Sequence, residues 1–239
     1  MALARSDHPT FAPTPPSATL PANTRPTVRS VPHHRRLPMK LFYAPGTCAL
    51  SPHIVLREAG LPYQLEKVDL KSHTTAGGGD FYALNPKGYV PVLELDDGRR
   101  LTEGPAVVQY LADRKPETGL APPPGTFERA QLQEWLNYIS TEVHKTFSLL
   151  FNSKLPPEFR EVTVANLGKK FDYLSKQLAT KNFLLGDAFS VADAYLYTLL
   201  RWTRAVKVDL TKWPTLQEYA ARIAARPAVK EALKEEGLA

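Results

Sequence analysis

The sequence contains a single cysteine, Cys48, and it has no long apolar run. One cysteine cannot form an internal disulfide, and it cannot build a multi-cysteine zinc or iron–sulfur site. No stretch approaches the roughly 18 consecutive apolar residues of a membrane-spanning helix. We therefore expect a protein without metal that does not bind or cross a membrane, and its free thiol needs an explanation.

The composition is that of an ordinary globular protein. The chain has 239 residues, of which 43% are hydrophobic and 23% are charged. A chain of this length and composition can bury a sizeable core, in one large domain or two small ones.

Positive charge is concentrated at the N-terminus. The net charge of +6 suggests an acidic partner such as nucleic acid. However, residues 1–38 hold five of the 30 basic residues and one of the 24 acidic residues, so the other 201 residues carry only +2. Because a nearly neutral folded part offers no strongly basic face, we expect no nucleic-acid partner.

The same segment, residues 1–38, holds eight of the 22 prolines and shows almost no periodic apolar pattern. Such a composition predicts a disordered extension. Its arginine-rich and acid-poor character partly fits an organelle transit peptide, but its proline density opposes the amphipathic helix of such peptides. A targeting segment, a flexible extension and a start codon placed too far upstream remain open.

Residues 39–116 alternate between strand and helix patterns. Ser51-Pro52 provides a helix start and Gly60 a stop, while Gly104-Pro105 begins a second helix. The order predicts an α/β domain with a mixed four-stranded sheet, βαβ followed by ββα. The expected strands are residues 40–44, 63–69, 90–95 and 99–102.

Residues 117–126 are rich in proline and glycine, and no convincing strand follows them. They predict a linker to an all-helical domain over residues 127–239. Ser190 and Asp193 have the spacing of a capping box at a helix start. The expected helices are residues 127–151, 157–179, 190–206 and 214–225.

Cys48 lies between the end of the first strand and the start of the first helix. Backbone N–H groups and the helix dipole at this position favour a thiolate, so we expect a lowered thiol pKa. The alternative is a small buried hydrophobic residue, which is the usual role of a lone cysteine. Since there is no CxxC motif, any redox chemistry is that of a single thiol.

Two further positions can bind a ligand backbone or an anion. Val90-Pro91 begins a strand, and with a cis peptide bond Val90 would turn its backbone N–H and C=O toward a peptide-like ligand. Glu103-Gly104 precedes a helix N-terminus, where the Gly104 N–H can bind a carboxylate and Glu103 an amine. A turn with a dipole-compensating acid explains Glu103 equally well.

The helix after the linker has one polar stripe and one apolar stripe. At about 100° per residue, the polar stripe faces a cleft or a partner, and a histidine beside a lysine there can stabilise a thiolate or a substrate anion. A histidine on a polar stripe is more often merely solvated. The polar stripe contains Asn137, Thr141, His144, Lys145 and Ser148.

Several motifs together resemble the bacterial beta-type, cysteine-containing class of glutathione transferases. They are MKLFYAPGTCALSPHIVLREAGLPY, NPKGYVPVLELDDG, LTEGPAVVQYLAD, EWLNYISTEVHK, FSVADAYLYTLLRW and RPAVKEALKEEGL. The resemblance runs over residues 39–239. It implies a thioredoxin-like N-terminal domain, a helical C-terminal domain and a cytoplasmic homodimer with a role in detoxification.

The resemblance also implies what the site residues do. Cys48 would lie beside the sulfur of the co-substrate glutathione and form a mixed disulfide with it, and His144 would line the cleft near the sulfur atoms. Asn137 would reach the glutathione of the other subunit. The implied catalytic residues are Cys48 and His144, and the implied glutathione-binding residues are Val90, Pro91, Glu103, Gly104, Asn137 and Lys145.

The sequence departs from this class in two places. Gly104 stands where many relatives have serine, so its backbone N–H must act alone. A basic residue usual in the loop before the second helix has no clear counterpart, which leaves the roles of Lys71 and His73 open. Tyr43 resembles a catalytic tyrosine of other classes, but we expect Cys48 to act here.

The resemblance implies conjugation of reduced glutathione to a small hydrophobic electrophile. Two alternatives remain open. Cys48 can instead support glutathione-dependent thiol–disulfide exchange, or the fold can bind ligands without catalysis. The apolar pocket of such a fold is formed by scattered side chains, so the sequence does not identify the electrophile.

Overall fold

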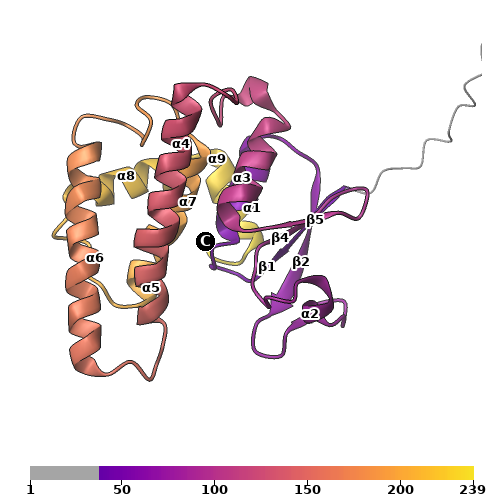
Figure 1. Cartoon of the computed structure of the whole chain (residues 1–239), viewed down its shortest axis with the longest axis horizontal. Helices are drawn as coiled ribbons and strands as arrows, with labels where there is room; N and C mark the ends of the chain where they lie inside the picture. Colours follow the sequence, from indigo (N-terminus) through magenta and orange to yellow (C-terminus); the bar gives the residue numbers. More distant parts are fainter. Residues whose placement is uncertain (1–37) are drawn as a thin grey trace, which may run out of the picture. The chain divides into compact units, whose positions relative to one another are not determined.

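The computed structural model describes residues 38–239 (Figure 1). The predictions for the segment before Pro38 lie outside this part. The α/β portion follows the predicted order of strands and helices. Its elements are β1 (Met39–Tyr43), α1 (Leu50–Glu58), β2 (Tyr63–Asp69), β3 (Thr74–Thr75), α2 (Phe81–Leu84), β4 (Val92–Glu94), β5 (Arg100–Thr102) and α3 (Gly104–Asp113).

The strands form one mixed sheet in the order β3-β2-β1-β4-β5. β1 and β2 are parallel because the crossover helix α1 connects them, and β4 pairs antiparallel with β1 and with β5. Leu41 in the central strand pairs with Leu65 on one side and Leu93 on the other. The predicted thioredoxin-like arrangement is confirmed.

Two short elements add to the predicted ones. β3 has only two residues, and α2 has four, with Asp80 accepting a hydrogen bond of 2.9 Å from the Tyr82 N–H at its start. Neither element is long enough to show an apolar period. The sheet therefore has a fifth, edge strand beyond the four that were expected.

The rest of the chain is helical, as predicted. A 3₁₀ turn, η1 (Pro116–Thr118), follows α3, and α4 begins directly after Thr126, whose side chain caps it. The Ser190–Asp193 capping box is present at the start of α7. The helices are α4 (Phe127–Tyr138), α5 (Lys145–Leu150), α6 (Pro157–Leu178), α7 (Val191–Ala205), α8 (Pro214–Ala224) and α9 (Pro227–Glu235).

The single helix expected over residues 127–151 is interrupted. A π-helical segment, η2 (Ile139–His144), separates α4 from α5. Such segments change the angular step of a helix and are frequent at functional sites. A stripe drawn at 100° per residue is therefore displaced after Tyr138.

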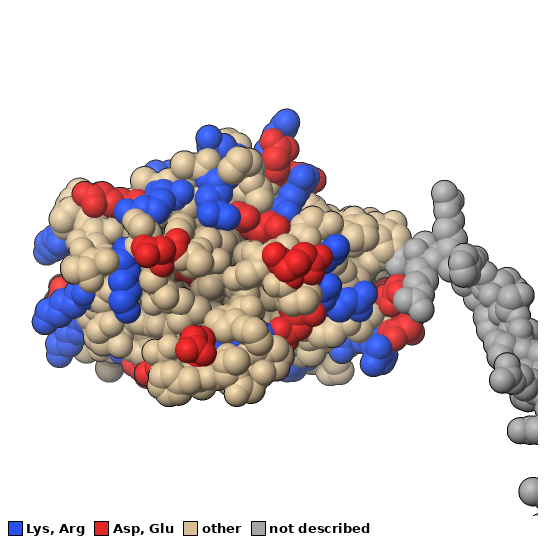
Figure 2. Space-filling model, turned by 90° about the horizontal axis from the view of Figure 1, so that it is seen from above, with Lys and Arg blue, Asp and Glu red and all other residues tan. Residues whose placement is uncertain are grey.

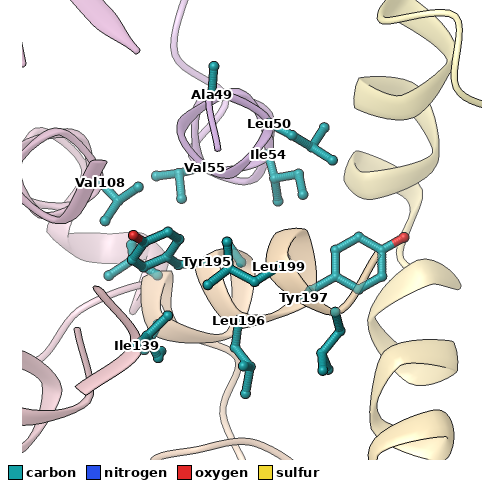
Figure 3. Packing of buried hydrophobic residues seen from close by; sticks show 14 of the residues in the cluster. Ala49, Leu50, Ile54, Val55, Val108, Ile139, Tyr195, Leu196, Tyr197 and Leu199 are labelled. Atoms are coloured by element: carbon teal, nitrogen blue, oxygen red, sulfur yellow. The ribbon is translucent and has the colours of Figure 1, made fainter. Parts of the chain in front are cut away.

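Helix α7 is the centre of the core, because nearly all of its residues are buried. Figure 3 shows Leu199 of α7 on the side that faces α1 and Leu196 on the opposite side, with Val108 of α3 and Ile139 of η2 near the ring of Tyr195. All of these side chains are at most 2% exposed. The helical portion and the sheet portion thus share one continuous core.

A second connection joins α1 to the end of α9 through charged groups. His53 is fully buried, with Nδ1 2.9 Å from Glu236 Oε1 and Nε2 2.7 Å from Glu235 Oε2. Glu235 also accepts from Tyr63 Oη at 2.7 Å and pairs with Arg57. These two carboxylates, Glu236 buried and Glu235 partly exposed, tie the end of α9 to the first βα unit.

The surface charge is mixed. On the face in Figure 2, Lys and Arg side chains are interspersed with Asp and Glu. Within residues 38–239, no helix is long and apolar enough to cross a membrane, and no three His, Cys, Asp or Glu side chains form a cluster that could hold a metal ion.

Replacing Glu235 by Gln should lower stability in a pH-dependent way. Burial alone would raise the pKa of Glu235, but hydrogen bonds from Arg57, Tyr63 and His53 lower it from 4.5 to about 2. The stabilisation is therefore complete above about pH 4.5 and is lost as the pH falls toward 2. Because the side chain is one-third exposed, we expect a loss of about 1–2 kcal/mol at pH 7.

Urea unfolding of the two proteins between pH 7 and 2 measures this difference. Glu231→Gln, at an exposed position of the same helix, is the matched control. A difference between wild type and Glu235→Gln that is the same at every pH would contradict the role of this carboxylate.

Candidate functional site

A cavity of about 750 Å³ lies where the loop after β1, the starts of β4 and α3, and the helices η2, α5 and α7 come together. Its size is typical of small-molecule sites. Seven of the eight predicted site residues line it, and Asn137 does not. The seven are Cys48, Val90, Pro91, Glu103, Gly104, His144 and Lys145.

The loop that carries Cys48 is fixed at Gly46. Gly46 has φ of +72°, a conformation that glycine adopts readily. Its carbonyl accepts a 2.8 Å hydrogen bond from Trp202 Nε1, and its N–H donates over 2.9 Å to Glu236 Oε2. Side chains of α7 and of the residue following α9 therefore hold the backbone two residues before the cysteine.

The Cys48 thiol is held as a neutral donor. Its Sγ lies 3.3 Å from the carbonyl oxygen of Val90, to which it donates. Burial and, less strongly, the charge of Glu103 raise the pKa of Cys48 to about 12, although the N–H groups of Cys48 and Ala49 act to lower it. The expectation of a lowered pKa is wrong for this structure, because burial outweighs the helix N-terminus.

Val90 is joined to Pro91 by a cis peptide bond, the arrangement under which the sequence predicts that Val90 turns its backbone toward a ligand. The preceding loop is braced by Asn85, whose Nδ2 donates to the carbonyl of Tyr89 at 2.7 Å. The Val90 side chain is buried, and its backbone faces the cavity beside Cys48.

Glu103 presents its carboxylate to the cavity from an unusual backbone conformation. Its φ is +69° at the residue just before α3, and its side chain is 70% exposed. A left-handed conformation at a non-glycine residue points to a functional constraint. The Gly104 N–H lies at the start of the same helix, and a Cβ at Gly104 would meet no atom within 4 Å.

Lys87 is a site residue that sequence reasoning missed. Its Nζ forms an ion pair with Glu103 and a 2.8 Å hydrogen bond with Thr102 Oγ1, and all three residues line the cavity. Lys87 lies in the NPKGYVP motif, but nothing in a single sequence indicates that it meets an acid 16 residues later. The Glu103 carboxylate is thus already paired with a cation.

His144 is neutral near pH 7. Burial and the charge of Lys145 together lower the pKa of its imidazole to about 4, while the charge of Glu103 opposes this shift. Nδ1 lies 2.6 Å from the hydroxyl of Tyr195, and the ring is edge-on to Trp202 with centroids 4.9 Å apart. Tyr195 and Trp202 were missed because they lie on a helix whose apolar residues indicate only core.

Several other expectations concern residues outside the cavity. Asn137 of α4 and Thr141 of η2 are exposed and do not line it, whereas Ser140 does. The π-helical step of η2 displaces the stripe only from Ile139 onward, so it accounts for Ser140 and Thr141. Lys71 and His73 are also absent from the lining, and His73 stacks on Tyr82 with centroids 4.3 Å apart.

Tyr43 lies outside the cavity lining as well. It is 8% exposed, and burial and the charges of Glu236 and Glu235 raise its pKa. The hydroxyl of Tyr43 therefore stays protonated near neutral pH.

The high pKa of Cys48 predicts slow alkylation. Without added ligand, the iodoacetamide rate should rise steadily with pH to at least about pH 10, because the reactive thiolate is the minor form throughout. Glu103→Gln should accelerate the reaction at each pH, since it removes a charge that raises the pKa, while Glu94→Gln outside the cavity should not. Intact-mass spectrometry follows the reaction, and a rate that levels off below pH 8 would refute a raised pKa.

Comparisons with known proteins agree with this geometry. The chain matches the Glutathione S-transferase N-terminal domain profile over residues 46–114 and the Glutathione S-transferase C-terminal domain profile over residues 138–227. It is 46% identical to Glutathione S-transferase GstA of Escherichia coli O157:H7 over 200 residues, covering 84% of this chain and 100% of GstA.

Three solved structures are similar along their whole length. BphK, a bacterial GST solved as a ternary complex, has a TM-score of 0.82 and 52% identity over 83% of this chain and 100% of its own. A sphingomonad glutathione S-transferase complexed with glutathione is 45% identical, and the bacterial beta-class enzyme of Sphingomonas chungbukensis is 44% identical. Both have TM-scores of 0.81 and cover 84% of this chain and 100% of their own. The chain therefore belongs to the glutathione S-transferase family, in its bacterial beta class.

Proposed function

We propose that this enzyme conjugates reduced glutathione to small hydrophobic electrophiles, and that Cys48 can form a mixed disulfide with glutathione. One observation carries the proposal: a single cavity holds a thiol, a strand backbone, an acid at a helix N-terminus and a cleft-lining histidine and lysine. The sphingomonad relative is a complex with glutathione, which supports this choice of ligand.

Glutathione would lie along the side of the cavity formed by β4 and α3. The backbone of Val90, before Pro91, would pair with the cysteinyl backbone of the ligand. Glu103 would hold the α-ammonium group of the γ-glutamyl end, and the Gly104 N–H would hold the α-carboxylate. In the structure Lys87 forms an ion pair with Glu103. Binding of the ligand ammonium to Glu103 would replace this pair, and Lys87 would then be free to face the ligand carboxylate.

Cys48 and His144 would act on the sulfur. In conjugation, the glutathione thiol loses its proton to solvent, the thiolate forms a bond to the electrophilic carbon, and the leaving group departs with its bonding electrons. Lys145 lines the cavity, and it has no ion-pair partner among residues 38–239, so its charge is available to the thiolate. Holding both reactants in place supplies the rest of the rate increase.

The electrophile would occupy the apolar end of the cavity. Phe151, Trp202 and Ala205 line this end, and the rings of Phe151 and Trp202 meet edge-on with centroids 5.3 Å apart. An aromatic wall of this kind suits a small hydrophobic substrate, such as an aryl halide, better than a charged one.

The proposal includes a homodimer in which Asn137 reaches the glutathione of the other subunit. Asn137 is exposed, and Tyr173, at 42% exposure, forms an aromatic cluster with Trp135 and Tyr138 beside it. A cytoplasmic location goes with this function, since reducing compartments maintain glutathione as a thiol. We keep residues 39–116, 117–126 and 127–239 as the proposed glutathione-binding domain, linker and helical domain.

Thiol–disulfide exchange is the second candidate function. The chain is 30% identical to Disulfide-bond oxidoreductase YfcG of Escherichia coli over 211 residues, covering 81% of this chain and 93% of YfcG. The Cys48 thiolate would attack a glutathionyl disulfide, forming the mixed disulfide and releasing the other sulfur as a thiolate. Cys48 lines the cavity, which gives a disulfide access to its sulfur, whereas its raised pKa makes the reaction slow.

A panel of conjugation and exchange assays separates these functions. The wild type should conjugate glutathione to an aryl halide or an epoxide, and an equimolar glutathione disulfide incubation should give a glutathione adduct on Cys48 by intact-mass spectrometry. Cys48→Ala should abolish the adduct, and His144→Ala should lower kcat for conjugation about tenfold or more. Tight binding of apolar compounds without any turnover would instead support a ligand-binding protein.

Gly104→Ser should strengthen glutathione binding. The space beside Gly104 admits a side chain, and a serine hydroxyl there adds a hydrogen bond to the ligand carboxylate. We expect KM for glutathione to fall about tenfold, the lower end of what a bond to a charged group provides. Gly104→Ala adds the Cβ alone and is the control. Equal KM values in the two variants would exclude a carboxylate at this helix terminus.

A further inference from the structure

The hydroxyl of Tyr195 has no role in the site so far, although it lies in the cavity. Tyr195 belongs to α7, and only 2% of it is exposed, since its ring is packed between α3 and η2 (Figure 3). Its hydroxyl oxygen is 2.6 Å from Nδ1 of His144. A rigidly packed phenol thus contacts the one histidine of the cavity.

His144 itself is held by more than this bond. Its ring lies edge-on to the rings of Tyr195 and Trp202, with centroid separations of 5.8 and 4.9 Å. The π-helical segment η2 brings Ser140, four residues earlier, to the same cavity wall. Burial raises the pKa of Tyr195, and the charges of Cys48 and Glu103 raise it further.

These contacts determine where the protons lie. Since the imidazole is neutral near pH 7, only one of its nitrogens carries hydrogen. The hydrogen-bond partner of the buried Tyr195 hydroxyl among residues 38–239 is Nδ1 of His144. If Nδ1 carried the imidazole hydrogen, the phenol O–H would be left without an acceptor, so the phenol donates to Nδ1. The imidazole hydrogen is then on Nε2.

The Nε2 atom of His144 faces the cavity. It has no hydrogen-bond partner among residues 38–239, and it is not one of the buried atoms without a partner in that part of the chain. Since His144 lines the cavity, Nε2 is accessible from it. A hydrogen at this position points to whatever binds there.

We propose that Tyr195 is a positioning residue that donates to Nδ1 of His144 and so fixes the Nε2–H tautomer, which presents a neutral hydrogen-bond donor to negative charge in the cavity. That charge is the glutathione sulfur or the departing group, and this identification rests on the proposed function. The tautomer itself depends only on contacts within the chain.

A neutral donor fits its surroundings. Lys145 of α5, Glu103 before α3 and Cys48 before α1 are the titratable groups whose charges act on the His144–Tyr195 pair. A protonated imidazole would be opposed by Lys145 and by burial, whereas a neutral N–H donor needs no compensation. The donor therefore stays in place from about pH 5 to pH 9, and it does not titrate near the usual histidine pKa of about 6.5.

Nitrogen-15 NMR of the full chain, with labelled histidine, tests the tautomer directly. His144→Gln identifies the His144 signals by their loss. The wild type should show hydrogen on Nε2 only, and Tyr195→Phe should give a mixture of tautomers and a higher imidazole pKa. Tyr197→Phe, on the same helix but outside the cavity, should leave the signals unchanged. Hydrogen on Nδ1 in the wild type, or unchanged signals in Tyr195→Phe, would overturn the proposal.

Kinetics then tests what the tautomer does. With glutathione and an aryl halide, Tyr195→Phe should lower kcat about tenfold, leave KM for glutathione within about twofold, and give a kcat–pH profile with a new inflection as His144 titrates. A loss confined to KM would overturn the role in the reaction. If the wild type conjugates nothing, the proposed function fails, and the NMR result still decides the tautomer.

Discussion

The backbone of Gly46 is the point on which the geometry of the site depends. The loop after β1 has no sheet or helix to hold it, yet it must deliver Cys48 to the start of α1. The Trp202 indole donates a hydrogen bond to the carbonyl of Gly46, and the Glu236 carboxylate accepts one from the Gly46 N–H. Glu236 is buried, and its other oxygen binds His53 of α1. The same carboxylate therefore fixes the loop relative to the helix that follows it.

The electrostatics of the cavity differ from those of a helix terminus in water. Cys48 lies before α1, but the backbone N–H groups there stabilise a thiolate less than burial and Glu103 destabilise it. His144 is neutral, so the charge that favours a sulfur anion comes from Lys145, while His144 contributes a hydrogen bond. The cavity therefore suits a thiolate that arrives with the ligand better than one formed on Cys48.

Local patterns predicted most of the fold. Apolar periods and Pro or Gly boundaries gave the four longer strands and the main helices, whereas β3 and α2 are too short to show a period. Cys48, Glu103 and Gly104 were found because they precede helices. Lys87 and Tyr195 were not found, because their roles depend on contacts with Glu103 and His144, which are distant from them in the sequence. The prediction of a lowered Cys48 pKa was wrong for the same reason, because the burial that raises this pKa is a property of the whole fold.

The separation of the Gly46 contacts along the chain also bears on how the molecule folds. Gly46 and Glu236 are 190 residues apart, and Gly46 and Trp202 are 156 apart. Contacts of such high sequence separation form late, because the chain loses the entropy of closing a long loop before the contact contributes any favourable free energy. The sheet and α1 can form earlier from nearby residues. The cysteine loop is thus among the last parts to become ordered, and until α7 and α9 have docked its thiol is open to solvent and to oxidants.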